Sequence, residues 1–318
     1  MVIPVMKRRA LFVGEAMVEL SLAPDGATAS IGVAGDVLNA AVYCRAGLGD
    51  NWQVAFVSAV GVDSFSNRIQ HFAEEHRIDC SGLKCDPSRE CGLYAIELKA
   101  SGERSFNYWR SESAARYMFG VVAPGDFSVL AGADLIFYSA ITLAILPQEI
   151  RIGFLEAIAC ARNAGCLIAF DSNYRLRLWE SSEIARRTIR QAWETCDIGF
   201  PSVDDEMALN GEGREEVKAR FAALGLQLCI LKEGENGPAI LSPVEGGDSI
   251  IWPKASEVVD TTGAGDAFDG AALGAWLETA DSKAAAAAGH STARKVVGIR
   301  GAIAPFLNRR TVPDSRKR

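Results

Sequence analysis

The stretch VVDTTGAGDAFDG, residues 258–270, decides the fold. Gly263 and Gly265 flank Ala264, and Asp266 follows directly. The residues after Asp266 are apolar at helical spacing, which predicts a core-facing helix that begins at the glycine turn. The unpaired N–H groups and the positive dipole end of such a helix start suit an anion. On the motif alone, Asp266 is either a helix-capping acid or part of an anion-handling site.

The composition fits a soluble globular enzyme and excludes several other classes of protein. The chain has 318 residues, of which 49% are hydrophobic and 23% charged. Its net charge of −7 gives no basic field for nucleic acid, so an anionic substrate would need local cations. No apolar run approaches the ~20 residues of a membrane span, and no secretion signal is evident. Because the eight cysteines are scattered without a CxxC pair, we expect reduced thiols and a cytoplasmic location.

Strand-like apolar runs alternate with helical patterns from residue 120 onward. This alternation predicts a mainly parallel sheet covered by helices on both faces. The predicted strands are 134–141, 166–173, 197–202, 226–234 and 239–243, and the predicted helices follow Pro147 and cover 182–196, 267–278 and 283–297.

The first third of the chain has a different pattern. The segments LFVGEAMVELSLAPDG (11–26) and CGLYAIELKASGERSFNYWR (91–110) are typical of exposed antiparallel strand pairs. The second would be a hairpin with Gly102 in its turn. We therefore expect one domain over 1–318 with a small β lid from insertions at about 15–33 and 91–118, followed by a flexible basic tail at 308–318.

Polar residues follow the predicted strands where ligands bind in open α/β sheets. They are Ser139, residues 171–175, residues 202–206, residues 232–237 and the Gly263 loop. The chain contains no GxxxxGK[ST], GxGxxG, GxSxG or HExxH motif, and its three histidines form no obvious catalytic or metal group. A P-loop nucleoside triphosphatase is thereby excluded, and so is a protein kinase, because its HRD and DFG motifs are absent.

DTTGAGDAFDG closely resembles the C-terminal motif of the ribokinase-like (PfkB) carbohydrate kinases. The likeness extends over nearly the whole chain, through GVAGDVLNAA (32–41), VGVDSFSNRI (60–69), LKEGENG (231–237) and GIRGAIAP (298–305). It implies a ribokinase-like three-layer α/β/α sandwich with a β-sheet lid, and it favours the functional interpretation of Asp266.

Three further stretches resemble the 2-keto-3-deoxygluconate kinases of this family more than its ribokinases, fructokinases or adenosine kinases. They are GERSFNYWRSESAAR (102–116), FDSNYRLRLW (170–179) and PSVDDE (201–206). A sugar-acid carboxylate calls for a dedicated arginine, and Arg110 and Arg175 are the candidates, the alternatives being a solvated lid charge and a structural ion pair. A kinase of a neutral sugar or nucleoside, or a non-catalytic sugar-binding regulator, remains as the alternative function. The sequence does not distinguish the gluconate from the galactonate epimer.

The resemblance also implies roles for individual residues in phosphoryl transfer from ATP. Asp266 would be the general base, and the N–H groups of Gly263, Ala264 and Gly265 would form the anion hole. Tyr94 either lines the sugar or only packs, and Asp36 either binds a hydroxyl or faces water. The remaining implied sugar contacts are Gly35, Asn39 and Tyr108, besides the two arginines.

The cofactors implied are ATP and Mg²⁺, with a monovalent cation near Asp260 left open. Gly234 and Gly237 form the nucleotide turn, while Lys232 either contacts ATP or points to water, and His290 either packs or contacts the nucleotide. The family commonly has N-x-x-E at 202–205, and this chain lacks that motif. The position of its acid corresponds to Asp205 or, with a one-residue shift, to Glu206, and either would hold Mg²⁺ through water. The exposed lid strands predict a homo-oligomer formed through the lid.

Overall fold

The computed structural model describes residues 7–23, 26–98, 104–121, 123–241, 250–305 and 307. Its core is an eight-stranded sheet in which only the pair β11–β12 is antiparallel. In spatial order the strands are β12 (Pro238–Ile240), β11 (Leu228–Lys232), β10 (Ile198–Phe200), β9 (Leu167–Asp171), β8 (Leu135–Ser139), β1 (Arg8–Val13), β4 (Trp52–Val60) and β5 (Leu83–Cys85).

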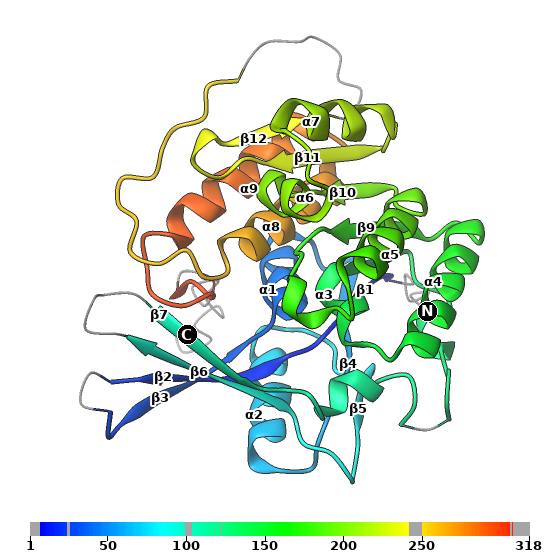
Figure 1. The fold of residues 1–318 in the computed structure, drawn as a ribbon, viewed down its shortest axis with the longest axis vertical. Coiled ribbons are helices and arrows are strands. Elements are labelled where there is room, and N and C mark those ends of the chain that lie inside the picture. The colour runs from blue at the N-terminus through cyan, green and yellow to red at the C-terminus, as the bar shows by residue number, and fades with distance from the viewer. Residues whose placement is uncertain are drawn as a thin grey trace, which may run out of the picture.

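Helices cover both faces of this sheet, which makes the three layers (Figure 1). One face packs against α1 (Asp36–Gly47), α2 (Ser64–Glu75), α8 (Ala264–Thr279) and α9 (Ser282–Val296). The other packs against α3 (Ala140–Ile145), α4 (Gln148–Asn163), α5 (Ser182–Glu194), α6 (Val203–Asn210) and α7 (Arg214–Ala223). Since successive side chains of a strand point to opposite faces, Phe12 joins the first core and Leu11 the second. The predicted α/β/α sandwich is confirmed.

A separate four-stranded sheet extends to one side of the sandwich and forms the lid (Figure 1). Its order is β3 (Ala29–Ala34), β2 (Met17–Leu22), β6 (Gly92–Leu98) and β7 (Arg104–Trp109). The pairs β2–β3 and β6–β7 are antiparallel, whereas the central pair β2–β6 is parallel. The strands lie in the two predicted insertions; Gly102 and the tail 308–318 lie outside the described residues.

The prediction for residues 11–26 was partly wrong. Residues 11–13 do not belong to an exposed strand pair but to β1, which lies between β8 and β4 in the middle of the main sheet. The uninterrupted apolar run Ala10–Val13 is fully buried, as strands covered on both faces are. The lid begins only after Glu15, at β2.

Short 3₁₀ turns complete the described elements: η1 (Ala114–Tyr117), η2 (Ser128–Leu130), η3 (Leu176–Leu178) and η4 (Gly234–Asn236). The helix predicted at 267–278 begins three residues earlier, at Ala264, because Gly263 is its N-cap in the left-handed conformation, with φ 70°. Within the described residues, no helix is both long and apolar enough to cross a membrane.

Candidate active site

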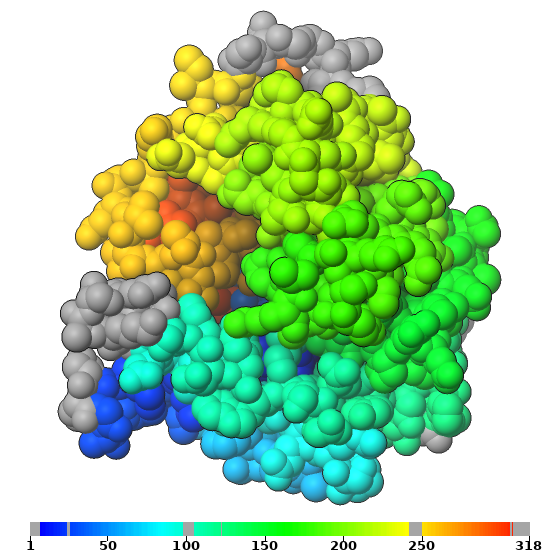
Figure 2. Space-filling model, viewed as in Figure 1, coloured from blue at the N-terminus to red at the C-terminus, as the bar shows by residue number. Residues whose placement is uncertain are grey.

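A cavity of about 660 Å³ lies between the lid and the carboxyl ends of the main-sheet strands. The surface is hollowed between the lid strands, the C-terminal helices and the central segments, as Figure 2 shows. The cavity brings together most of the residues singled out in the sequence: Gly35, Asp36, Asn39, Tyr94, Tyr108, Arg110, Arg175, Asp205, Lys232, Gly234, Gly263, Gly265 and Asp266.

A second cavity, of about 490 Å³, adjoins the first on the side of α9. It is lined by Gly237, Ala264 and His290 among others. His290 Nε2 lies 2.8 Å from the carbonyl oxygen of Pro253, and its ring packs on Trp252. The two cavities share four lining residues: Lys232, Gly234, Thr261 and Gly265. A group passed from one cavity to the other would therefore pass the start of α8.

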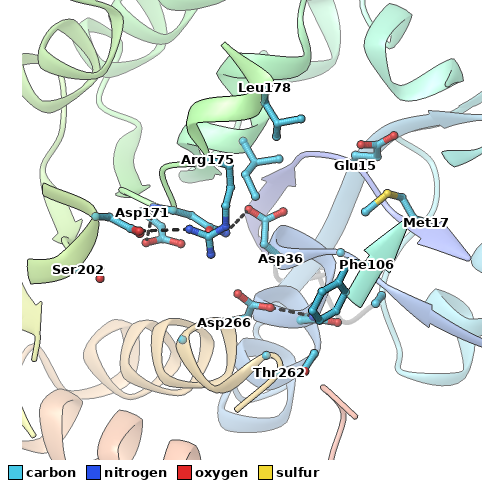
Figure 3. A pocket seen from close by; sticks show the side chains of 18 of the residues that line it. Glu15, Met17, Asp36, Phe106, Asp171, Arg175, Leu178, Ser202, Thr262 and Asp266 are labelled. Carbon is cyan, nitrogen blue, oxygen red and sulfur yellow. Dashed lines mark hydrogen bonds and ion pairs between the residues drawn. The ribbon is translucent and has the colours of Figure 1, made fainter. Parts of the chain in front are cut away.

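Asp266 lies in the first turn of α8 and faces the first cavity, with Asp36 nearby (Figure 3). Its Oδ2 accepts a hydrogen bond of 2.8 Å from Asn39 Nδ2. Burial, reinforced by the negative charge of Asp36, raises the pKa of Asp266 to about 7. A carboxylate with that pKa is suited to accept a proton near neutral pH.

The glycine turn before Asp266 has little room for side chains. A Cβ on Gly263 would lie 2.5 Å from the Cβ of Ala302, and the positive φ of Gly263 also disfavours other residues. Asp260 fixes the preceding residues: its Oδ1 accepts from Thr262 N at 3.0 Å and from Thr262 Oγ1 at 2.7 Å. Its Oδ2 accepts from the N–H of Gly301 at 3.0 Å. The N–H groups at the start of α8 are thus held in place beside both cavities.

Asp36 and Asn39 project from the first turns of α1, which starts directly after lid strand β3. Asp36 Oδ2 accepts hydrogen bonds from Ser139 Oγ at 2.6 Å and Asn173 Nδ2 at 2.9 Å. Burial raises the pKa of Asp36. Asn39 Oδ1 is buried and has no hydrogen-bond partner within the described part of the chain. Since Asn39 lines the cavity, this oxygen could accept a hydrogen bond from a ligand hydroxyl.

Lys232 lies at the end of β11. One of the two alternatives from the sequence was that Lys232 points to water, and the structure shows that it does not. Its Nζ lies between Asp171 Oδ1, at 2.9 Å, and Asp269 Oδ2, at 2.7 Å. The two carboxylates outweigh the effect of burial and raise the pKa of Lys232, so it is charged. A Cβ on Gly265 would lie 3.9 Å from this Nζ, which places the charge beside the turn shared by the two cavities.

Arg110, which also lines the cavity, is held by a residue that the sequence analysis missed. Glu15 is 1% exposed and follows β1; its carboxylate accepts hydrogen bonds from Arg110 Nη2 and, at 2.5 Å, from Ser113 Oγ. Arg110 is therefore not a solvated lid charge. Only one of its donors is used by Glu15 in these contacts, so the guanidinium retains others for a ligand. The signal that could have found Glu15 is an acid at the carboxyl end of a buried strand.

Arg175 and Asp205 also line the cavity and form an ion pair of 3.2 Å, and Asp205 also accepts from Tyr174 N. Arg175 and Asp36 both point into the cavity in Figure 3. Both members of the ion pair are partly exposed to the cavity, and burial raises the pKa of Asp205. Asp205 is thus accessible to a ligand or a hydrated cation.

Glu206 does not line the cavity, which corrects its inclusion among the metal candidates. It is 1% exposed, accepts from Trp193 Nε1 at 3.1 Å and pairs with Arg220 at 2.9 Å. It lies next to Asp205 on α6, and consecutive helical positions point in different directions. Glu206 therefore stabilises the packing of α5, α6 and α7 and has no access to the site.

Two tyrosines of the lid line the cavity. Tyr94 donates to Glu19 and stacks on Tyr108 with ring centroids 5.5 Å apart, so it both packs and faces the cavity. The guanidinium of Arg177 lies over the ring of Tyr108, 4.2 Å from its centroid. Arg177 and Glu19 were missed in the sequence, because their partners come from segments far away in the chain.

These features define a class before any relative is considered: an α/β protein with a lid, in which a carboxylate faces a cavity at the start of a helix. A match to the pfkB family of carbohydrate kinases covers residues 7–309. The chain therefore belongs to the pfkB family of carbohydrate kinases and is an enzyme of that family, as its motifs predicted.

Individual relatives agree with this assignment. The chain is 38% identical over 302 residues to 2-dehydro-3-deoxygluconokinase of Dickeya dadantii (strain 3937), covering 92% of this chain and 96% of that protein. It is 36% identical over 306 residues to the Escherichia coli (strain K12) protein of the same name, covering 94% and 98%. Among solved structures, a Vibrio cholerae O395 fructokinase double mutant with fructose, ADP and potassium matches with a TM-score of 0.77 at 24% identity, covering 93% of this chain and 94% of that one.

Proposed function

We propose that the protein transfers the γ-phosphoryl group of ATP to the terminal hydroxyl of 2-keto-3-deoxygluconate, giving the 6-phosphate. The observation that carries this proposal is the position of Asp266, at an amide-rich helix start, in a cavity that also contains Arg110 and Arg175. The relatives from Dickeya dadantii and Escherichia coli, at 38% and 36% identity, are named for the same activity (2-dehydro-3-deoxygluconate is a synonym).

In this proposal the sugar acid occupies the first cavity. Its carboxylate pairs with the free donors of Arg110 and Arg175, since planar guanidinium groups match carboxylate geometry. Its hydroxyls bond to Asn39 Oδ1, to the backbone at Gly35 and to Asp36, and its carbon chain lies against Tyr94 and Tyr108 of the lid. All the residues in these proposed contacts line the cavity: Gly35, Asp36, Asn39, Tyr94, Tyr108, Arg110 and Arg175.

ATP occupies the second cavity, against the turn that contains Gly234 and Gly237 and near His290, with its γ-phosphate at the boundary between the cavities. Asp266 accepts the proton of the terminal hydroxyl as that oxygen bonds to the γ-phosphorus, and ADP leaves. The N–H groups of Gly263, Ala264, Gly265 and Asp266 stabilise the charge on the transferred phosphoryl. Lys232, beside Gly265, adds a fixed positive charge at the same point.

Mg²⁺ fits the residues present only as a water-mediated ligand. Asp205 reaches the cavity, but its oxygens already accept from Arg175 and Tyr174. Mg²⁺ in such sites keeps several waters and binds mainly to substrate phosphates. Bound there, it would neutralise phosphate charge. The same proposal includes a monovalent cation near Asp260, which is tested by comparing turnover in potassium chloride and in choline chloride. It also includes a homo-oligomer formed through the lid, which is tested by size exclusion with light scattering.

The substrate is tested by ATP consumption with 2-keto-3-deoxygluconate, its galactonate epimer, other sugar acids, and the neutral sugars fructose and ribose. We expect a deoxy sugar acid to give the highest kcat/KM. If fructose or ribose outperforms every sugar acid, the chain is a neutral-sugar kinase. If no acceptor stimulates ATP consumption while sugar binding persists, it is a non-catalytic regulator.

The role of the arginines is tested by Arg175→Ala. Loss of a hydrogen bond to a charged group costs about 1.5–3 kcal/mol, so the KM for the sugar acid should rise about 10- to 100-fold. The KM for a neutral analogue should change little. Arg110→Ala should act in the same way, but it is made together with Glu15→Gln, because Glu15 would otherwise be left buried and unpaired.

Arg190→Ala is the matched control, since Arg190 is 74% exposed on α5 with only a 3.9 Å contact to Glu194. Equal rises in KM for acid and neutral substrates would show that the arginines do not recognise the carboxylate.

A further inference from the structure

Tyr43 lies on α1 one helical turn after Asn39, so both side chains project from the same face of the helix. Tyr43 is 2% exposed. Its hydroxyl donates to the carbonyl oxygen of Ala302 at 2.8 Å and accepts from the N–H of Ala304 at 2.9 Å. One side chain thus holds two backbone groups of the segment that follows α9.

The segment 301–304 forms the back of the glycine turn. The Cα hydrogens of Gly263 face Ala302 so closely that a methyl group there would lie 2.5 Å from the Ala302 Cβ. Gly301 bonds to Asp260 on the other side of the turn. The ring of Tyr43 packs in one buried cluster with Ala304 and with Ala267 of α8. A displacement of 302–304 would therefore displace the turn.

Helix α1 is itself fixed against α8 by glycines. A Cβ on Gly270 would lie 2.2 Å from the carbonyl oxygen of Ala40, and one on Gly274 would lie 3.1 Å from that of Cys44. The two helices are thus in direct backbone contact along two turns. Asn39 reaches Asp266 and Tyr43 reaches residues 302–304 from this rigid support, so α1 sets both the proposed base and the wall behind the amides.

We propose that Tyr43 is a positioning residue for phosphoryl transfer: its hydroxyl fixes residues 302–304 and thereby the N–H groups of the Gly263–Asp266 turn. The inference rests on the proposed anion hole and adds a residue that touches neither substrate. Preorganised donors stabilise a transition state only when they already point at the developing charge, so a small shift of the turn lowers the rate. Burial raises the pKa of Tyr43 to about 12, so its hydroxyl remains a donor at any working pH.

Tyr43→Phe tests this inference, because it removes the hydroxyl and keeps the ring in the cluster. Removing a whole oxyanion donor costs about 10²–10³ in kcat, and a displaced donor less, so we expect kcat to fall about 10-fold or more. The KM for the acceptor and the affinity for ADP alone should stay within about twofold of the wild type. The affinity for ADP with aluminium fluoride in the presence of the acceptor should fall by the same factor as kcat.

Tyr138→Phe is the matched control, since Tyr138 is a fully buried tyrosine in the core on the opposite face of the sheet. A merely structural role of Tyr43 would lower the melting temperature and the fraction of binding-competent protein measured by calorimetry, without changing the affinity for the transition-state analogue. That result, or a wild-type kcat, would overturn the inference.

A second variant perturbs the same segment from its other end. Gly301 has a φ of 83°, and a Cβ added there would have no atom within 4 Å, so Gly301→Ala strains only the backbone. It should reproduce the loss of kcat and of analogue affinity while Tyr43 is intact, and unchanged analogue affinity would count against the inference. If the wild type does not phosphorylate the sugar acid, the proposed substrate fails; the same comparison with the acceptor that is active then tests Tyr43 separately.

Discussion

Replacing Asp266 by Asn should inactivate the enzyme and, at the same time, stabilise its fold above neutral pH. Asn has the same shape and can still accept the hydrogen bond that Asn39 donates to Asp266 Oδ2. It cannot accept a proton, and a positioned general base typically contributes ~10²–10⁴ to the rate. We therefore expect kcat to fall by about that factor while sugar binding is retained.

The gain in stability follows from the pKa of Asp266, which burial and the charge of Asp36 raise from 3.8 to about 7. Between these values the native state holds a proton that the unfolded chain has lost, so the stability of the wild type falls as the pH rises from about 4 to about 7. The cost is complete above pH 7 and amounts to at most roughly 4 kcal/mol. An Asn at this position never ionises, so the variant avoids this cost.

Urea unfolding of both proteins at pH 5 and pH 8 measures the effect. The stability gain of Asp266→Asn should be larger at pH 8 than at pH 5 by up to ~2.5 kcal/mol, from the same linkage relation. Asp50→Asn is the matched control, because Asp50 is 87% exposed in a surface pair with Arg77. The kcat/KM of the wild type should rise with pH through about 7, as the free enzyme's base ionises. A stability gain independent of pH would refute the raised pKa, and near-normal turnover of the variant would refute the role as base.

Two other substitutions test the boundary between the cavities. Lys232→Met leaves Asp171 and Asp269 buried without their cation, so it should destabilise the fold by about 3–5 kcal/mol in urea unfolding. Adding Asp269→Leu should restore part of that stability. If it restores none, the pairing of Lys232 with Asp269 is contradicted. Gly263→Ala places a methyl group against Ala302 at a position with φ 70°. It should lower kcat at least about tenfold and leave the KM for the acceptor unchanged. A wild-type kcat would show that the turn tolerates a side chain.

The layers of the sandwich could be predicted from sequence because each strand carries its own signal. Continuous apolar runs separated by amphipathic helices admit few arrangements other than a covered parallel sheet. The exception, β1, shows the limit of this signal. Its apolar run ends at Val13 and strand β2 follows closely, so residues 11–13 were predicted to belong to an exposed strand pair although they lie at the centre of the main sheet.

The partners of the charged side chains could not be predicted, because they come from distant segments. Arg110 lines the cavity, but Glu15, 95 positions earlier, holds its guanidinium. Glu206 and Asp205 are adjacent in sequence, and only the position of α5 and α7 shows that one is enclosed and the other reaches the cavity. Residue type and spacing establish which groups are available, whereas tertiary packing establishes which of them a ligand can reach.

The same argument applies to charge. Asp171 and Asp269 are buried and both pair with Lys232, while Asp36 and Asp266 line the adjoining cavity, where two further anions, ATP and a sugar acid, are proposed to bind. Neighbouring carboxyls in a poorly solvated site disfavour one another's ionised form. Accordingly, the pKa values of Asp36, Asp266 and Asp269 are all raised. These three carboxyls therefore hold a proton more readily than an exposed aspartate does. Burial raises the pKa of Asp266 to about 7 even though the hydrogen bond from Asn39 and the charge of Lys232 act to lower it, so this carboxyl can exchange a proton near neutral pH.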